Sequence, residues 1–169
     1  MLFLKKLSEC DGKDVYNMLQ DIEADINGFS NEVKDMPYEE YLKWLERQVE
    51  ISNGINLPEW MVPQTTFWLY SDSTPVGIGR IRHYLNDALK ENGGHIGYAI
   101  SSAHRGSGYG NEILRLLLIE CKMMGIGIDG VQLRVDPYKQ NESSNRIILN
   151  NGGKLTRQTE EKNFYVIEI

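Results

Sequence analysis

Apolar positions in the N-terminal part of the chain predict one strand followed by two helices. Met1–Leu7 is a short apolar run that is typical of a strand. After Asp11, apolar residues recur three and four positions apart as far as Ile26, which is the spacing of one helical face. Pro37 begins a second predicted helix, with apolar residues along one side from Tyr38 to Val49.

The middle of the chain predicts three further strands. Thr65–Tyr70 and Val76–His83 have strand-like composition, and Ser71–Pro75 between them is typical of a hairpin connection. Asn86–Gly93 is a polar link with room for a helical turn. Gly94–Ser101 is the fourth predicted strand.

The C-terminal part predicts two helices and three strands. Asn111–Met124 is apolar on most sides, so we expect a largely buried helix. A fifth strand at Gly130–Asp136 and a short helix at Glu142–Asn150 follow. Lys154–Gln158 and Asn163–Ile169 predict a closing hairpin. The element order, βααβββαβαββ, contains no repeat or linker and predicts one mixed α/β domain over residues 1–169.

Composition restricts the classes of function. The chain is 41% apolar and 25% charged over 169 residues, which suits one globular domain with a substantial core. Two cysteines are too few for a disulfide framework. The chain has no long apolar run and no signal-peptide pattern, so we expect a cytoplasmic protein that makes no membrane contact. A net charge of −6 argues against a nucleic-acid partner.

The stretch Arg105-Gly106-Ser107-Gly108-Tyr109-Gly110 lies between a predicted strand and the long predicted helix. A glycine-rich turn at a helix N-terminus presents free backbone N–H groups at the positive end of the helix dipole. Such a turn favours binding of a phosphate or pyrophosphate. A tight turn without any ligand is the structural alternative.

Two known phosphate-binding patterns fit this turn poorly. A P-loop needs Lys followed by Ser or Thr after its last glycine, whereas Asn111 and Glu112 follow here. The dinucleotide fingerprint places glycines at positions one, three and six, which differs from the spacing of residues 106, 108 and 110. The acidic residue Asp136 downstream keeps a dinucleotide-binding oxidoreductase open as an alternative.

A third pattern fits better. Arg-x-x-Gly-x-Gly at residues 105–110, after a strand that ends at Tyr98–Ser101, resembles motif A of the GNAT superfamily of N-acetyltransferases. Asn141–Ser144, with Asn151–Gly153 closing the next helix, resembles the second motif of that family. The resemblance is strongest over residues 94–155. Two further stretches, residues 82–86 and 93–98, resemble a bacterial subgroup of predicted acetyltransferases within the superfamily.

The resemblance implies a GNAT fold of the α/β (α+β) class. Its central sheet would be mixed but mostly antiparallel, with six to seven strands flanked by about four helices. It also implies acetyl-CoA as co-substrate, no metal, and a small-molecule or peptide amine as acceptor. Homodimers are frequent in the family, although no interface pattern is visible in this sequence.

The resemblance assigns cofactor-binding roles to ten residues. The turn would hold the pyrophosphate through its backbone, and the main chain at the end of the fourth strand would pair with the pantetheine arm. Side chains of the second motif would face the same arm. These residues are Ile100, Ser101, Arg105, Gly106, Ser107, Gly108, Tyr109, Gly110, Asn141 and Ser144.

The sequence offers several candidate catalytic residues. His95 is a candidate general base because an unperturbed imidazole titrates near neutral pH. If the family register holds, residues 94, 96 and 98 face the acceptor, which favours Tyr98 instead. His83 is a further base candidate, and His104 is expected to be exposed. Many family members carry a proton-donating Tyr at the position that Ile148 occupies here.

Acceptor specificity should reside in the two N-terminal helices, the 52–64 loop and the link between the third and fourth strands. Trp60 in that loop is a candidate pocket wall. The missing Tyr at Ile148 also keeps open a non-catalytic acyl-CoA-binding or regulatory domain of the same fold.

Overall fold

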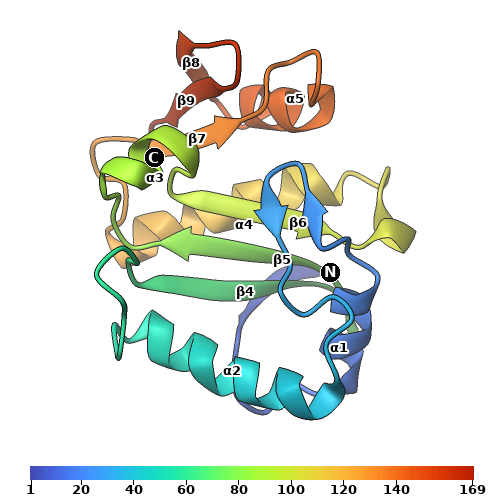
Figure 1. Ribbon diagram of the computed structural model, residues 1–169. Helices are drawn as coiled ribbons and strands as arrows, with labels where there is room; N and C mark the ends of the chain where they lie inside the picture. The colour runs from blue at the N-terminus through green and yellow to red at the C-terminus, as the bar shows by residue number, and fades with distance from the viewer.

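A four-stranded antiparallel sheet forms the larger part of the fold in the computed structural model, which describes residues 1–169 (Figure 1). Its strands are β1 (Leu2–Lys6), β4 (Gln64–Ser71), β5 (Thr74–Arg82) and β6 (Ile96–Ile100), in the order β1-β4-β5-β6. The predicted strands of this region are therefore present, although β6 begins two residues later than expected.

A second antiparallel sheet contains the C-terminal strands. Its members are β7 (Val131–Val135), β8 (Lys154–Gln158) and β9 (Asn163–Ile167), in the order β7-β9-β8. One isolated bridge, between Gly94 and Leu133, connects it to the first sheet. The single sheet that we expected is thus divided, because β6 and β7 separate directly after that bridge.

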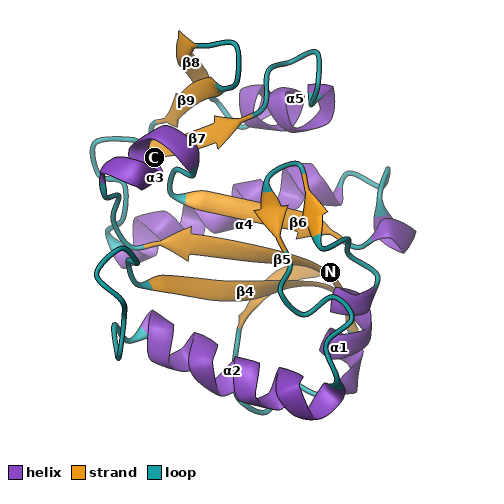
Figure 2. Ribbon diagram, in the orientation of Figure 1, coloured by secondary structure: helices purple, strands orange, loops and turns teal.

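Helices cover both faces of the larger sheet (Figure 2). The helices α1 (Lys13–Gln20) and α2 (Tyr38–Ser52) bury their apolar residues against Trp68 and Ile78. On the opposite face, α4 (Tyr109–Met124) packs Leu117 against Gly79 so closely that a Cβ there would lie 2.7 Å from the leucine. Alternate residues of β5 therefore face opposite layers.

The first helix is shorter than predicted. It ends at Gln20, and the following segment forms a small hairpin of β2 (Asp25–Ile26) and β3 (Phe29–Ser30). Its two turn residues, Asn27 and Gly28, have φ values of 51° and 81°. Asn-Gly readily adopts this left-handed pair of conformations, which favours a tight hairpin over continuation of the helix.

Two short α-helices and one 3₁₀ turn complete the fold. The polar link contains α3 (Asp87–Asn92), whose first turn is capped by Asn86, and a single 3₁₀ turn, η1 (Ser102–His104), follows β6. α5 (Glu142–Asn150) is capped by Asn141 and packs beside α4. Both caps satisfy backbone donors that a helix N-terminus leaves free.

Asp11 is the most deeply buried charge beneath this scaffold. Its carboxylate is 0% exposed, forms an ion pair with Lys5, and accepts hydrogen bonds from Ser8 N and Trp68 Nε1 at 2.8 and 2.7 Å. The Tyr41 hydroxyl donates to the Asp11 carbonyl oxygen at 3.0 Å. This network fixes the entry to α1 against the sheet.

Candidate active site

A cleft of about 1010 Å³ opens where β6 and β7 separate. It extends from the glycine turn, along the edge of β6, to the β2–β3 hairpin and α3. One ligand can therefore enter it from the glycine turn and a second from the end formed by the β2–β3 hairpin and α3.

The edge of β6 that faces this cleft is unpaired over most of its length. Arg82 N donates to His95 O at 2.8 Å and Ser101 N donates to Val76 O at 3.0 Å, so odd-numbered residues of the strand bond to β5. In an antiparallel ladder the backbone groups of alternate residues point to opposite sides, so those of Tyr98 and Ile100 point toward β7. Since β7 touches this edge only near Gly94, an extended ligand chain can add to it as a further strand.

The glycine turn ends beside this edge and has the geometry of an anion site. Gly106 and Gly108 have φ values of 79° and 80°, and a Cβ at either position would meet no atom within 4 Å. Glycine is therefore required at these two positions by the left-handed backbone conformation and not by close packing. A Cβ at Gly110 would lie 2.8 Å from the Ile147 side chain, so this glycine allows α4 and α5 to pack. No side chain caps α4, which leaves its first N–H groups open to the cleft.

The side chain of Arg105 is occupied within the protein. Its guanidinium pairs with Glu23, holding the pKa of that carboxyl at about 2, and its Nε donates to Ile100 O at 3.0 Å. Asp21, on the same N-terminal segment, accepts from Ser102 Oγ and Ala103 N. These contacts hold the turn in place, so the groups left for a pyrophosphate are backbone amides.

Tyr98 has an unsatisfied polar atom inside the cleft. Its hydroxyl is buried without a hydrogen-bond partner, although the residue also lines the cleft. Burial raises the pKa of this phenol, and the Ser144 side chain, which is close enough to interact with the hydroxyl but does not form a well-aligned hydrogen bond, offsets the rise only in part. Tyr98 therefore remains protonated at neutral pH and can donate a hydrogen bond to a ligand atom.

The remaining predicted cofactor residues divide into two groups. Ser144 lines the cleft, as does most of the turn. Ser101, Ser107 and Asn141 do not line it. Ser101 Oγ instead bonds to Val76 O and to His104 Nδ1, and Asn141 Oδ1 caps α5 while its buried Nδ2 has no partner.

Comparison with known proteins agrees with this geometry. A family model described as an acetyltransferase (GNAT) domain matches residues 1–154.

The chain belongs to the GNAT acetyltransferase family.

Solved GNAT structures share the fold at low sequence identity. RimL, a ribosomal L7/L12 alpha-N-protein acetyltransferase in complex with coenzyme A, matches with a TM-score of 0.70 and 14% identity, covering 99% of this chain and 94% of that one. Campylobacter jejuni N-acetyltransferase PseH in complex with acetyl coenzyme A gives 0.64 and 10%, covering 99% of both chains. A GNAT-family acetyltransferase from Streptococcus pneumoniae gives 0.62 and 16%, covering 98% and 97%. No curated protein sequence matches the chain.

These findings confirm the predicted family, fold class and enzyme class: the protein is a GNAT N-acetyltransferase. None of its helices combines the length and the apolar character needed to cross a bilayer.

In this GNAT chain the two base candidates, His95 and His83, lie away from the cleft, whereas His104, which we expected to be exposed, is half-buried and lines it. His95 is only 7% exposed and its Nδ1 accepts a hydrogen bond from Gln132 N at 2.9 Å. Burial, followed by the charges of Arg134 and Arg82, lowers the pKa of His95 to about 4. His83 lies outside the cleft lining, with its Nε2 2.8 Å from Thr65 Oγ1. His95 therefore ties the start of β6 to β7.

The facing directions along β6 differ from our expectation. Ile96 and Tyr98 pack with the α4–α5 layer, whereas Gly97 faces Phe29 of the β2–β3 hairpin on the α1–α2 side. The ladder with β5 runs from Ile96 to Ile100 without a bulge that could reverse these directions. The position of the family's usual Tyr, Ile148, is fully buried in the core. Tyr98 reaches the cleft from the cofactor side.

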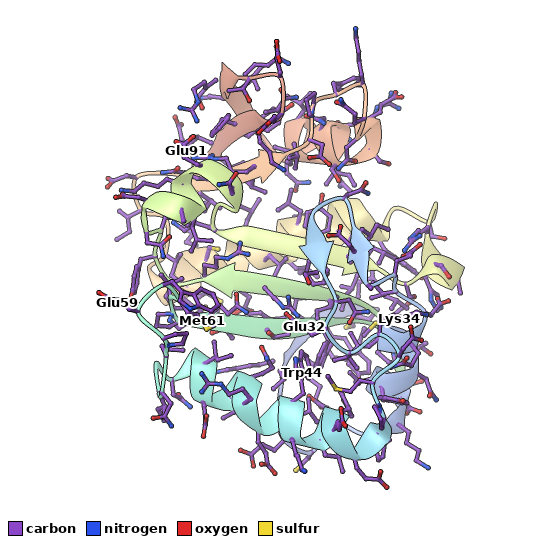
Figure 3. The ribbon with its side chains drawn as sticks, in the orientation of Figure 1. Glu32, Lys34, Trp44, Glu59, Met61 and Glu91 are labelled. Atoms are coloured by element: carbon purple, nitrogen blue, oxygen red, sulfur yellow. The ribbon has the colours of Figure 1, made fainter.

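Sequence reasoning missed the charged residues at the other end of the cleft. Arg80 and Arg82 on β5 and Glu32 after β3 all line it. Arg80 Nη2 pairs with Glu32 Oε2 at 2.9 Å. Figure 3 labels Glu32 in front of the sheet, over the same face as Met61 from the 52–64 loop. The alternation of two arginines in an otherwise apolar strand was the available signal, since it puts both on one face.

Proposed function

We propose that this GNAT domain transfers the acetyl group of acetyl-CoA to a primary amine by direct attack in a ternary complex. The observation that carries the proposal is the continuity of the cleft. One opening joins an uncapped helix N-terminus, an unpaired strand edge and a separate polar compartment. These three parts fit a pyrophosphate, a pantetheine arm and an acceptor, respectively.

Acetyl-CoA, when bound, supplies the activated acetyl group. The amides from Gly108 to Gly110 would hold its pyrophosphate. The Ile100 main chain would pair with its pantetheine arm through the N–H, since the carbonyl oxygen already accepts from Arg105 Nε. The backbone N–H of Tyr98 points to the same gap and would polarise the thioester carbonyl. The RimL and PseH structures, solved with coenzyme A and acetyl coenzyme A, support this choice of co-substrate.

Tyr98 is our candidate for the proton donor to the departing sulfur. Its hydroxyl is buried, protonated and without an internal partner, which is what a hydrogen bond to a thiolate requires. It would replace the family's Tyr, whose position is the buried Ile148.

The acceptor must lose a proton, because an amine with a pKa of about 10.4 is largely protonated at neutral pH. Glu32 is the one carboxylate that lines the cleft, and it lies in the acceptor compartment. We propose that the ammonium first releases one proton to water, so that a neutral amine attacks. Glu32, directly or through water, then receives the second proton while the new carbon–nitrogen bond forms and the carbon–sulfur bond breaks. The departing sulfur takes its proton from Tyr98, which recovers one from solvent.

A thermal-shift series with acetyl-CoA, NAD and ATP tests the co-substrate. A ligand at about 100 times its Kd adds about 2.7 kcal/mol to the free energy of unfolding. For a domain of this size, that raises Tm by roughly 5–11 °C. Stabilisation by acetyl-CoA alone is expected, and no shift at saturating acetyl-CoA would refute the proposal.

A second candidate, a non-catalytic acyl-CoA-binding domain, is favoured by one observation. No His or carboxylate on β6 itself reaches the cleft, so this strand supplies no imidazole or carboxylate base. Thiol release from acetyl-CoA in the presence of amines distinguishes the two functions. Binding without thiol release across a broad amine series would support the second.

A further inference from the structure

The cleft is rich in cations although the protein carries a net charge of −6. Glu32 is its only acidic lining residue. The basic lining residues, leaving His104 aside, are Arg80, Arg82, Arg105, Arg134, Arg146 and Lys162. The ionic partner of each cation shows which of them remains available to a ligand.

Four of these cations are satisfied by the protein itself. Arg105 pairs with Glu23, Arg146 with Glu142 and Lys162 with Asp136. The remaining residue of this group, Arg134, engages all three of its guanidinium nitrogens. Its hydrogen bonds go to the carbonyl oxygens of Lys90, Leu133 and Tyr165 and to Gln132 Oε1.

The two arginines of β5 are different. Arg82 donates one hydrogen bond, from Nη1 to Gly94 O at 3.0 Å, and forms no ion pair. Arg80 is 7% exposed, donates from Nη1 to Ser30 O at 2.9 Å and pairs with Glu32 through Nη2, while its buried Nε has no partner. Protein interiors rarely contain a charge without a counter-ion or a buried N–H without an acceptor, because removing such a group from water without a new partner is costly.

The electrostatics agree with this geometry. Burial, and secondly the charge of Arg80, lower the pKa of Arg82 to about 10, and no carboxylate opposes the shift. Arg82 therefore remains a cation at neutral pH without a counter-anion. The single carboxylate at this end of the cleft, Glu32, pairs with Arg80 and not with Arg82.

The position of Arg82 argues against a role at the pyrophosphate. Arg82 N bonds to His95 O, at the start of β6, whereas the glycine turn follows its far end at Ile100. Five to six residues of extended strand separate these points by roughly 17–20 Å. The arginines instead lie near the β2–β3 hairpin and α3, in the acceptor compartment.

We infer that the amine acceptor also carries an oxyanion, a carboxylate or a phosphate, which is held by the free donors of Arg82 and by Arg80 Nε. A planar guanidinium matches either group and forms strong charge-assisted hydrogen bonds with it. Glu32, beside Arg80, would face the amino group of the same molecule. The compartment thus fits a zwitterionic acceptor, and the inference rests on the proposed acetyl transfer.

Binding of product-like pairs tests the inference without turnover. The probes are N-acetylglycine against its amide, 4-acetamidobutanoate against its amide, and N-acetyl-O-phosphoethanolamine against N-acetylethanolamine. Each Kd is measured by calorimetry or ligand-observed NMR, on the free protein and on the protein saturated with coenzyme A. In at least one pair the oxyanion should bind about tenfold or more tightly than its neutral counterpart. The responding pair distinguishes carboxylate from phosphate.

Variants assign the preference to the arginine. Arg82→Gln should reduce the ratio of the two Kd values to within about twofold, and Arg82→Lys should retain part of it. Arg115→Gln, on the exposed side of α4 and paired with Glu112, is the matched control and should keep the full ratio. The Kd of acetyl-CoA and the Tm should change little in Arg82→Gln.

Three results would overturn the inference: no pair shows a preference, Arg82→Gln retains it, or Arg82→Gln weakens acetyl-CoA binding instead. Failure of the proposed function has a different signature. In that case acetyl-CoA would not stabilise the protein, whatever the behaviour of the oxyanion pairs.

Discussion

The unpartnered hydroxyl of Tyr98 gives a prediction in which stability and activity move in opposite directions. Tyr98→Phe removes one oxygen atom and keeps the ring that packs with the α4–α5 layer. Because the buried hydroxyl has no partner, its removal should stabilise the fold. A buried unsatisfied polar group costs about 1–3 kcal/mol, and each kcal/mol corresponds to about 2–4 °C in Tm for a domain of this length.

The same substitution should slow acetyl transfer. A hydrogen bond to a charged group contributes about 1.5–3 kcal/mol, so its loss should lower kcat by about 10- to 100-fold. The KM for acetyl-CoA should change little, because the hydrogen bond strengthens only as charge develops on sulfur. Thermal unfolding and a thiol-release assay provide the two measurements.

Tyr84→Phe is the matched control, since Tyr84 is 56% exposed and does not line the cleft. It should change neither quantity. If Tyr98→Phe lowers Tm and leaves kcat unchanged, the hydroxyl has an internal partner such as Ser144 and no role in the chemistry. Ser144→Ala would then lower Tm in the wild type but not in the Tyr98→Phe background.

Three further predictions concern other parts of the chain. Gly108→Val, at a φ of 80°, should abolish acetyl-CoA binding in calorimetry while circular dichroism shows an intact fold, and unchanged affinity would refute the backbone pyrophosphate site. The pKa of His95 is about 4 in the folded state and about 6.5 in the unfolded state, so the fold favours the neutral imidazole. The free energy of unfolding should therefore be highest above pH 6.5 and should fall as the pH drops from 6.5 to 4. His95→Asn should flatten that pH dependence of Tm and leave the pH profile of kcat/KM unaltered; a lost acidic limb would instead identify His95 as the base. Asp11→Ala should lower the free energy of unfolding by about 2–4 kcal/mol in urea titrations, because Trp68 Nε1 loses its buried acceptor, and a change below about 1 kcal/mol would contradict this network.

Local patterns in the sequence were sufficient for most of the fold. Periodicity located the main strands and helices, because their apolar faces are set by residues close in sequence. The β2–β3 hairpin was missed although Asn27-Gly28 is a strong turn signal, since its strands are only two residues long. The division into two sheets depends on how β6 and β7 diverge, which no local pattern encodes.

The candidate site is easiest to predict from sequence where one short segment builds it. The glycine turn is such a segment, and Gly106 and Gly108 have the backbone conformations that it requires. The ion pair of Arg105 with Glu23 joins residues 82 positions apart, so spacing gave no sign that this side chain is occupied. The isolation of the Tyr98 hydroxyl and of Arg82 likewise emerges only when distant elements pack together.

The divergence of the two sheets has a consequence for the lifetime of the protein. The three-stranded sheet meets the rest of the backbone ladder at one bridge, so we expect it to open locally more often than the larger sheet. A ligand lying along β6 would span both parts and suppress that opening in proportion to its saturation. Amide hydrogen exchange in β7–β9 and cleavage by proteases should therefore slow as the concentration of acetyl-CoA rises. The lifetime of the enzyme would then depend on the concentration of its own acetyl donor.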